Sequence, residues 1–171
     1  SLTLKGEYND NVFYSRTNEI DDYIGHVNPA LEFGYVSELL DLKANADVDF
    51  LYYSDETDLD TETQFYELGF GYQIFERWRI FGDGSYRKDT TLDSYLEETG
   101  RVNVREDIRR STAGGGLSYE ITERSDLDIN YDYSKTDYEL NSSTDNERHT
   151  IALSYNNLLK NNLDIISLHP S

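Results

Sequence analysis

Apolar and polar side chains alternate along most of this chain. The clearest stretch is "LDLKANADVDFLYY", residues 40–53, in which every second side chain from Leu40 to Tyr52 is apolar and the intervening side chains from Asp41 to Asp49 are polar. A period of two is typical of a β-strand with two unlike faces. The same pattern recurs over residues 2–8, 23–36, 66–74, 78–86, 112–121, 127–133 and 149–156, and a short further stretch begins near Leu163. The sequence therefore predicts an all-β chain of eight or nine strands.

The connections between these stretches alternate in length. Short turns are expected at residues 37–39, 75–77, 122–126 and 160–162. Long polar loops are expected at approximately residues 10–22, 54–63, 87–111 and 134–148. Antiparallel neighbours joined in this way place all short turns at one end of a sheet and all long loops at the other. The pattern predicts an antiparallel up-and-down sheet built from repeated hairpins.

The apolar face of such a sheet could contact either a protein core or lipid. The stretch 40–53 is longer than the roughly 9–11 residues that a tilted strand needs to cross a bilayer. Aromatic residues stand near the ends of the apolar stripes, as they do at the lipid–water boundaries of transmembrane barrels. The predicted lipid-interface aromatics are Tyr23, Tyr35, Tyr52, Tyr72, Trp78, Tyr119, Tyr133 and Tyr155. These features favour an antiparallel up-and-down transmembrane β-barrel, and a soluble β-sheet protein is the alternative.

Charge and cysteine content exclude several classes of function. The chain of 171 residues has 15 Lys and Arg against 34 Asp and Glu, a formal charge of -19. Nucleic-acid binding needs a basic surface, so no nucleic-acid partner is expected. The chain has no cysteine, which excludes disulfides and thiolate metal sites. Cations or basic partners suit such an acidic chain better.

The polar side of the predicted strands carries most of the candidate functional residues. In a barrel this side lines the interior, so an acidic wall predicts a cation preference if the interior is an open channel. If the interior is plugged, these acids must instead pair with residues such as Lys43 and Arg79. The lumen-lining candidates are Glu32, Asp41, Lys43, Asp47, Asp49, Glu67, Arg79, Asp83, Glu120, Asp128 and Asp132. His26 and His149 are also expected on polar faces. No catalytic motif includes them, so no enzyme activity and no catalytic residue are expected.

One basic run, "GRVNVREDIRR", stands out in the acidic chain. It contains Arg101, Arg105, Arg109 and Arg110. A loop folded into the lumen would bring these residues against the acidic wall and narrow the pore. The alternative is a strand end with ordinary surface ion pairs, each of which contributes little to stability.

The acidic loop "DETDLDTE" provides weak metal-ligand candidates in Asp55, Asp58 and Asp60. An EF-hand loop needs Gly at its sixth position and Glu at its twelfth. Counting from Asp55, those positions hold Asp60 and Tyr66, so the loop is not an EF-hand. A looser Ca²⁺ or Mg²⁺ contact or a solvated acidic loop are the two remaining interpretations, and no other cofactor is expected.

Three segments resemble a known family. "YNDNVFYS" (8–15), "DDYIGHVNPALEFGY" (21–35) and "GLSYEITERSDLDINYDYSKTDYE" (116–139) are similar to the outer-membrane β-barrel porins often called BBP2-like. The resemblance implies an integral protein of a Gram-negative outer membrane with a porin-like or scaffolding role. Implied partners are the lipid bilayer, lipopolysaccharide, the outer-membrane assembly machinery, and export or envelope proteins, because some relatives are encoded with exopolysaccharide export systems.

The C-terminal end departs from that family's pattern. Such barrels typically end on a strand with a terminal aromatic residue, whereas this sequence ends "ISLHPS". We expect residues 1–171 to form a single β-barrel domain or the N-terminal part of a larger one. A closed eight-stranded barrel with a tail from about Asn161 is the other arrangement. The expected function is passive passage of small polar or cationic solutes, or membrane scaffolding; the alternative is a soluble secreted binding module that uses the acidic loops.

Overall fold

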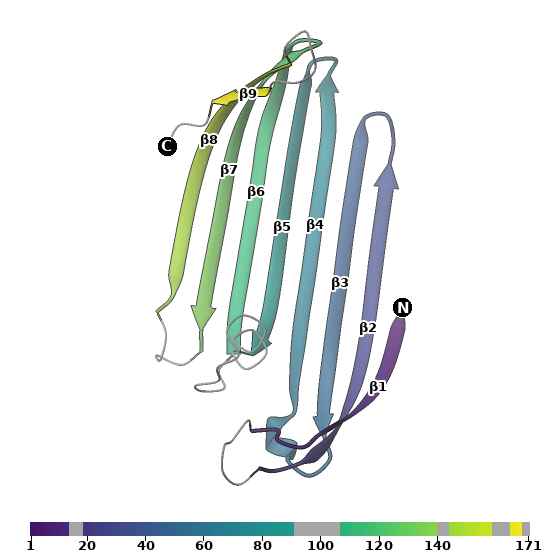
Figure 1. The fold of residues 1–171 in the computed structure, drawn as a ribbon. Coiled ribbons are helices and arrows are strands. Elements are labelled where there is room, and N and C mark those ends of the chain that lie inside the picture. The colour runs from purple at the N-terminus through teal and green to yellow at the C-terminus, as the bar shows by residue number, and fades with distance from the viewer. Residues whose placement is uncertain (14–18, 91–106, 140–143, 159–164, 169–171) are drawn as a thin grey trace.

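The chain folds into one antiparallel β-sheet of nine strands, in which each strand pairs with the next in the chain (Figure 1). The computed structural model describes residues 1–13, 19–90, 107–139, 144–158 and 165–168. The strands are β1 (Leu2–Asn9), β2 (Asp22–Val36), β3 (Leu40–Tyr53), β4 (Thr61–Phe75), β5 (Trp78–Thr90), β6 (Asp107–Thr122), β7 (Ser125–Tyr138), β8 (Asn146–Leu158) and β9 (Ile165–Leu168). The predicted all-β, up-and-down antiparallel fold is confirmed. The described residues contain no helix long and apolar enough to cross a membrane.

Short and long connections lie at opposite ends of the sheet, as the alternating spacing predicted (Figure 1). The short turns at residues 37–39, 76–77 and 123–124 lie together at the upper end in Figure 1. The strand ends that the longer links join lie at the lower end, where the link between β3 and β4 contains a short 3-10 helix, η1 (Thr57–Leu59). We call the two ends the short-turn end and the long-loop end.

The strands extend farther toward the long-loop end than the sequence predicted. β5 continues to Thr90 and β6 begins at Asp107, so the loop predicted for residues 87–111 is wrong at both boundaries. The loops predicted for 54–63 and 134–148 are also too long, because β4 begins at Thr61 and β7 ends at Tyr138. The reason is that polar residues remain in the backbone ladder: Arg87 pairs in register with Arg110. Hydrophobicity marks only the part of each strand that has an apolar face.

Within the described residues, the sheet is open. A closed eight-stranded barrel would pair β1 with β8, but β8 pairs with β9, through Tyr155 opposite Leu168 and Leu158 opposite Ile165. Among the described strands, β1 pairs only with β2. The structure therefore does not support the eight-stranded alternative, and β1 and β9 are the two edges of the described sheet.

The long-loop end is organised by Asp22, the first residue of β2. Its side chain is buried, and its carboxylate accepts hydrogen bonds from the backbone N–H groups of Tyr23 (2.6 Å), Ser54 (3.1 Å), Asp55 (3.1 Å) and Glu56 (2.9 Å). Burial acts to raise the pKa of Asp22, but these backbone donors together lower its pKa below the usual value. The loop between β3 and β4 is thereby attached to the start of β2.

Candidate functional site on the polar face

The register of the ladders defines two unlike faces. Directly opposite residues of antiparallel strands point to the same side of a sheet. One face carries Leu42 and Ala44 of β3 together with Phe70 and Leu68 of β4, and we call it the apolar face. The other face, the polar face, carries Asp41, Lys43, Asn45, Asp47 and Asp49 of β3 and the residues in register with them.

The apolar face has no covering layer among the described residues. Leu31, Leu68 and Ile151 are 68%, 59% and 75% exposed. Only Val12, Ile24 and Ile108 are buried hydrophobic residues in the described part of the chain. A soluble domain buries such side chains in a core, so this face needs an apolar environment.

The apolar stripe runs diagonally across the sheet. On β7 its last aromatic residue toward the long-loop end is Tyr133, which is in register with Phe33 of β2 through Ala113, Gly84, Leu68 and Ala44. On β2 the stripe continues ten positions farther, to Tyr23.

At the short-turn end, the positions of the turns are displaced across the sheet in the same direction as the apolar stripe. β3 begins at Leu40, whose register partner on β7 is Ile129, whereas β7 itself begins at Ser125, four positions farther. With a rise of about 3.3 Å per residue and about 4.8 Å between strands, the two shifts correspond to slopes of roughly 55° and 35°. Strands tilted by about 35–45° in a level lipid layer would give a stripe of this kind.

All eight predicted interface aromatics lie on the apolar face. Trp78 and Tyr119 are direct cross-strand partners at the short-turn end, with ring centroids 4.4 Å apart. At the long-loop end, Tyr23 packs on Tyr8, with centroids 5.1 Å apart. Their contact with lipid stays a prediction, but each has the orientation that such contact needs.

Charged residues of the polar face form several cross-strand pairs. Lys43 Nζ lies 3.0 Å from Glu67 Oε1, and the amide of Asn45 donates to Glu67 Oε2 over 2.8 Å. Arg79 on β5 reaches Asp41 on β3 over 2.5 Å by lying across Gly71 of the strand between. A Cβ at Gly71 would overlap the guanidinium, so a larger residue there would require the end of the Arg79 side chain to move.

A second polar cluster lies nearer the long-loop end. His26 is 14% exposed, and its Nδ1 lies 2.9 Å from Asp49 Oδ2. The amide of Asn28 donates to Asp47 over 3.0 Å. The predicted position of His26 on the polar face is confirmed, and this cluster joins β2 to β3 through charge-assisted hydrogen bonds.

Glycine and charge alternate along one row of the polar face. In register across the sheet stand Gly34, Lys43, Gly69, Asp83, Gly114, Asp132 and Thr150. Asp83 and Asp132 flank Gly114, and a Cβ built there would lie 3.2 Å from a carboxylate oxygen of each. Both carboxylates are exposed, and neither has an ion pair within the described residues. We call this set the glycine–charge row.

The remaining lumen candidates differ in their contacts. Asp128 accepts a hydrogen bond from the amide of Asn156 over 3.1 Å. Glu32 is in register with Asn45, and Glu120 with Asp126. The register therefore places every predicted lumen residue on the polar face, while the presence of a lumen stays a prediction.

The arginines predicted as a constriction do not form one group. Arg101 and Arg105 lie outside the described residues. Arg109 and Arg110 are successive residues of β6, so they point to opposite faces. Arg110 lies on the polar face and pairs with Asp89 over 3.0 Å, whereas Arg109 lies on the apolar face. These two residues belong to a strand and not to a loop folded into the interior.

The predicted position of His149 is wrong. His149 is in register with Tyr133, which places it on the apolar face. Its ring centroid is 5.0 Å from that of Tyr133, and its Nδ1 is 2.8 Å from the hydroxyl of Tyr131. His149 lies two positions from Ile151, so the alternation alone would have given the correct face.

The acidic residues suggested as metal ligands have structural contacts. Asp60 accepts a hydrogen bond from the backbone N–H of Tyr53 over 2.8 Å, and the Asp55 backbone is held by Asp22. The part of the chain that the structure describes contains no group of three His, Asp or Glu side chains arranged to hold a metal ion. Binding of Ca²⁺ or Mg²⁺ at this loop stays an untested prediction.

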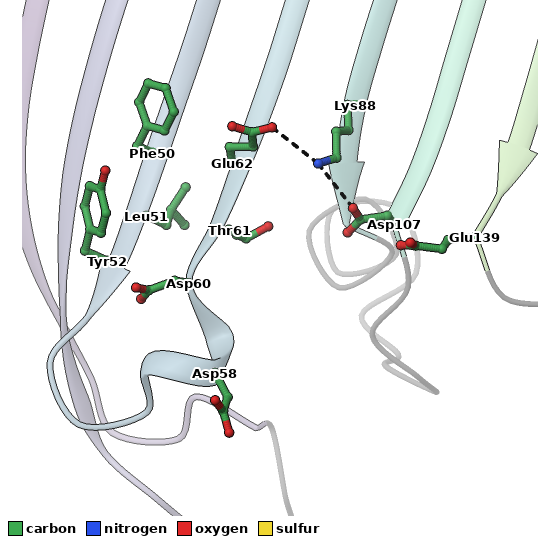
Figure 2. A pocket seen from close by; sticks show the side chains of 10 residues that line it. All are labelled: Phe50, Leu51, Tyr52, Asp58, Asp60, Thr61, Glu62, Lys88, Asp107 and Glu139. Atoms are coloured by element: carbon green, nitrogen blue, oxygen red, sulfur yellow. Dashed lines mark hydrogen bonds and ion pairs between the residues drawn. The ribbon is translucent and has the colours of Figure 1, made fainter.

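A hollow of about 570 Å³ opens at the long-loop end between β3, β4 and β5 (Figure 2). Figure 2 shows Lys88 between Glu62 and Asp107, with Nζ–oxygen distances of 3.5 and 3.3 Å. The sequence did not single out these residues, because they approach only when β4, β5 and β6 pair in the observed register.

The comparison with known families decides the class of the protein. The model of one family, described as "Putative MetA-pathway of phenol degradation", matches residues 18–144, about three quarters of the chain. The chain belongs to this family. It is a family of outer-membrane β-barrel proteins, which agrees with the β-strand-rich structure. No curated protein and no solved structure matches the chain.

Membership in the phenol-degradation family supports the coarser part of the predicted resemblance. Both families consist of outer-membrane β-barrels, but the comparison does not confirm the BBP2-like family itself. The match includes β2 to β7, the strands that carry the glycine–charge row from Gly34 to Asp132.

Proposed function

We propose that this chain forms the wall of an outer-membrane β-barrel through which small polar or cationic solutes pass passively. The observation that carries the proposal is the exposed, diagonal apolar stripe, since a level lipid layer around tilted strands accounts for both its exposure and its slope. Membership in a family of outer-membrane barrels supports the same location. The transport is non-enzymatic, and the assembly machinery of the outer membrane would insert the strands.

Selectivity would arise at the polar face. The glycine–charge row places Asp83 and Asp132 on alternate strands with no side chain between them. Solutes passing this row would meet exposed carboxylates in a space left open by Gly69 and Gly114. Fixed negative charge along a pore wall raises the local concentration of cations and favours their passage.

Planar-bilayer recording tests this proposal. In a KCl gradient, the wild-type protein should show a reversal potential shifted toward that of K⁺. Replacing both Asp83 and Asp132 with Asn should reduce the shift, whereas Asp137→Asn, on the apolar side of β7, should not. Anion preference in the wild type would contradict the proposed selectivity. A protein that stays folded and monomeric without detergent would contradict the membrane location and favour a soluble binding module. Insertion without conductance would favour a scaffold.

A second candidate substrate class is small aromatic solutes. The family description refers to phenol degradation, and the polar face carries aromatic rings that the sequence analysis missed, among them Phe65 and Phe81. The guanidinium of Arg87 lies 5.3 Å from the Phe65 ring centroid. Faster flux of tyramine than of an aliphatic amine, lost in Phe65→Leu and Phe81→Leu, would support this class; equal flux would reject it. A link to exopolysaccharide export stays a prediction from the sequence resemblance.

A further inference from the structure

A hollow of about 370 Å³ on the polar face has a carboxylate and a guanidinium on opposite sides of an aromatic ring. Asp47 of β3, Phe65 of β4 and Arg87 of β5 stand in one register row, so their side chains project from the same face of adjacent strands. The guanidinium carbon of Arg87 lies 5.3 Å from the centroid of the Phe65 ring. All three side chains line the hollow.

Asp47 and Arg87 differ from the other charged groups around this hollow, which have close partners of opposite charge. Those partners are His26 with Asp49 (2.9 Å), Arg110 with Asp89 (3.0 Å), and Lys88 with Glu62 and Asp107 (3.5 and 3.3 Å). Asp47 accepts a hydrogen bond from the neutral amide of Asn28, and Arg87 contacts the Phe65 ring. Neither Asp47 nor Arg87 makes an ion pair within the described residues. One negative and one positive group thus remain for a solute.

A second carboxylate–guanidinium combination on the same two strands shows what keeps Asp47 and Arg87 apart. Nearer the short-turn end, Arg79 of β5 reaches Asp41 of β3 by lying across Gly71 of β4. Beside Asp47, the corresponding position of β4 carries a phenyl ring and not a hydrogen atom. The ring occupies the space that holds the guanidinium over Gly71, so here the two opposite charges face the hollow without meeting.

We propose that this hollow binds a short zwitterionic ω-amino acid, with its ammonium group on Asp47, its hydrocarbon chain on the Phe65 ring and its carboxylate on Arg87. The inference rests on the proposed function, because it names a class of solute for the face that would line the pore. Hydrogen bonds between ionised groups are about twice as strong as neutral ones, and the planar guanidinium matches a carboxylate with two parallel donors. The face of the ring provides an apolar surface for the methylene groups.

The spacing of the strands sets the length of the solute. Asp47 and Arg87 are two strands apart, about 9.6 Å at the backbone, and two charge-assisted hydrogen bonds of about 2.8 Å each leave about 4 Å between the charged groups of the solute. β-Alanine and γ-aminobutyrate separate their charges by a comparable distance, whereas the charges of glycine lie closer together. A solute with a single charge would leave either Asp47 or Arg87 without a partner.

Saturation-transfer NMR of the protein in detergent micelles tests the proposal by measuring the dissociation constants of three probes. The probes are γ-aminobutyrate, n-butylamine and butyrate, which have the same number of carbon atoms and differ in charge. Arg87→Gln should weaken γ-aminobutyrate by about tenfold, the loss expected for one charge-assisted hydrogen bond, and should not weaken n-butylamine. Asp47→Asn should weaken both γ-aminobutyrate and n-butylamine, and should not weaken butyrate.

Matched controls remove one charge elsewhere on the polar face. Arg148→Gln on β8 and Glu120→Gln on β6 change the net charge by the same amounts, and neither residue lines the hollow. Both variants should bind the three probes like the wild type. If they weaken γ-aminobutyrate as much as the variants of Arg87 and Asp47 do, the effect belongs to the general field of the polar face and the site is rejected.

Phe65→Gly tests the role of the ring in keeping the two charges apart. Without the ring, Arg87 should reach Asp47 as Arg79 reaches Asp41, so binding of both γ-aminobutyrate and n-butylamine should be lost. Adding Arg87→Gln to Phe65→Gly should restore binding of n-butylamine, because it frees Asp47. Phe65→Leu keeps a large side chain between the charges and should still bind γ-aminobutyrate, which tests the same role if Phe65→Gly does not fold.

Three outcomes would overturn the zwitterion site: γ-aminobutyrate bound no more tightly than its singly charged analogues, no effect of Arg87→Gln or Asp47→Asn, or unchanged binding in Phe65→Gly. Binding in micelles is measured whether or not the protein conducts, so this inference and the proposed function fail separately. Binding without conductance would count against the pore alone. Conductance without binding would count against the site alone.

Discussion

β3 and β7 are both fourteen residues long, but their apolar stripes differ in length. On β3 the apolar face is continuous from Leu40 to Tyr52. On β7 it stops at Tyr133, and the next positions on that face are Lys135 and Asp137. Equal strands with unequal stripes indicate that the two strands are displaced relative to the apolar layer. The last residues of β7, after Tyr133, therefore extend beyond the apolar layer, whereas β3 remains within it.

The largest expected effect comes from placing the same charge on two strands in one register row. Ala46 of β3 is in register with Ser111 of β6 through Tyr66 and Tyr86. Ala46 is the middle position of its stripe, so Ala46→Arg should destabilise the protein in lipid vesicles by about 2–4 kcal/mol. Ser111 is at the edge of its stripe, so Ser111→Arg should cost about 0–1 kcal/mol. Reversible urea unfolding in vesicles measures both.

Equal costs at the two positions would contradict the diagonal apolar layer. That outcome would also remove the main support for the membrane location, since the slope is what distinguishes a lipid layer from an ordinary exposed face. Glu32→Ala, on the exposed polar face of β2 beside the register partner of Ala46, is a control for general sensitivity of this part of the sheet and should unfold like the wild type.

The strands and their apolar faces could largely be predicted from the sequence, but the slope of the apolar stripe across the sheet could not. The bounds of β3 follow from alternation alone, because every apolar-face position from Leu40 to Tyr52 is hydrophobic. The long-loop ends of β5 and β6 were missed because Lys88 and Arg109, on the apolar side of these strands, are charged and interrupt the hydrophobic alternation. The slope of the stripe depends on the register between strands, which single-strand periodicity does not contain.

In the candidate site too, the face of each residue could be predicted from the sequence, but the contacts between strands could not. Alternation assigned the acidic residues to one face correctly. It did not reveal that Arg79 crosses Gly71 to reach Asp41, because that contact joins alternate strands. The role of Asp22 was also missed, since it depends on the loop after β3 returning to the start of β2.

An effect of intermediate size is expected on amide exchange when the aspartates that hold the loops after β3 and β7 are replaced. Asp22 accepts the backbone N–H groups of three residues after β3 and that of Tyr23, whereas Asp145 accepts one, from Tyr138 at the end of β7 (3.0 Å). Asp22→Asn removes the charge and one acceptor oxygen, so amide exchange at residues 54–56 should accelerate by about tenfold, in proportion to the added local opening. Asp145→Asn keeps its acceptor and should change exchange little. Similar acceleration in both variants would contradict the special role of Asp22.

Acid should reproduce the Asp22 effect. Because the folded pKa of Asp22 is lowered, its stabilising contribution is complete above the unfolded pKa of about 3.9 and is lost as the pH falls through the folded value. Pepsin cleavage within residues 54–60 should therefore increase in the wild type below about pH 4. The Asp22→Asn variant should be cleaved already at higher pH, with a weaker dependence. An identical pH profile in both proteins would assign the acid sensitivity to other carboxylates.

The smallest expected effect distinguishes the two faces by conductance. Asp47 lies on the polar face of β3, whereas Asp137 lies on the apolar side of β7 beyond its stripe. Asp47→Ala should lower the preference for K⁺ over Cl⁻ by roughly twofold, because a unit charge about 8 Å from an ion is worth about 0.5 kcal/mol in water. Asp137→Ala should leave the reversal potential unchanged, since its carboxylate would lie outside the barrel. A larger shift in Asp137→Ala than in Asp47→Ala would mean that the two faces have been assigned to the wrong media. The side of the sheet that carries Asp137 would then face the conducting path.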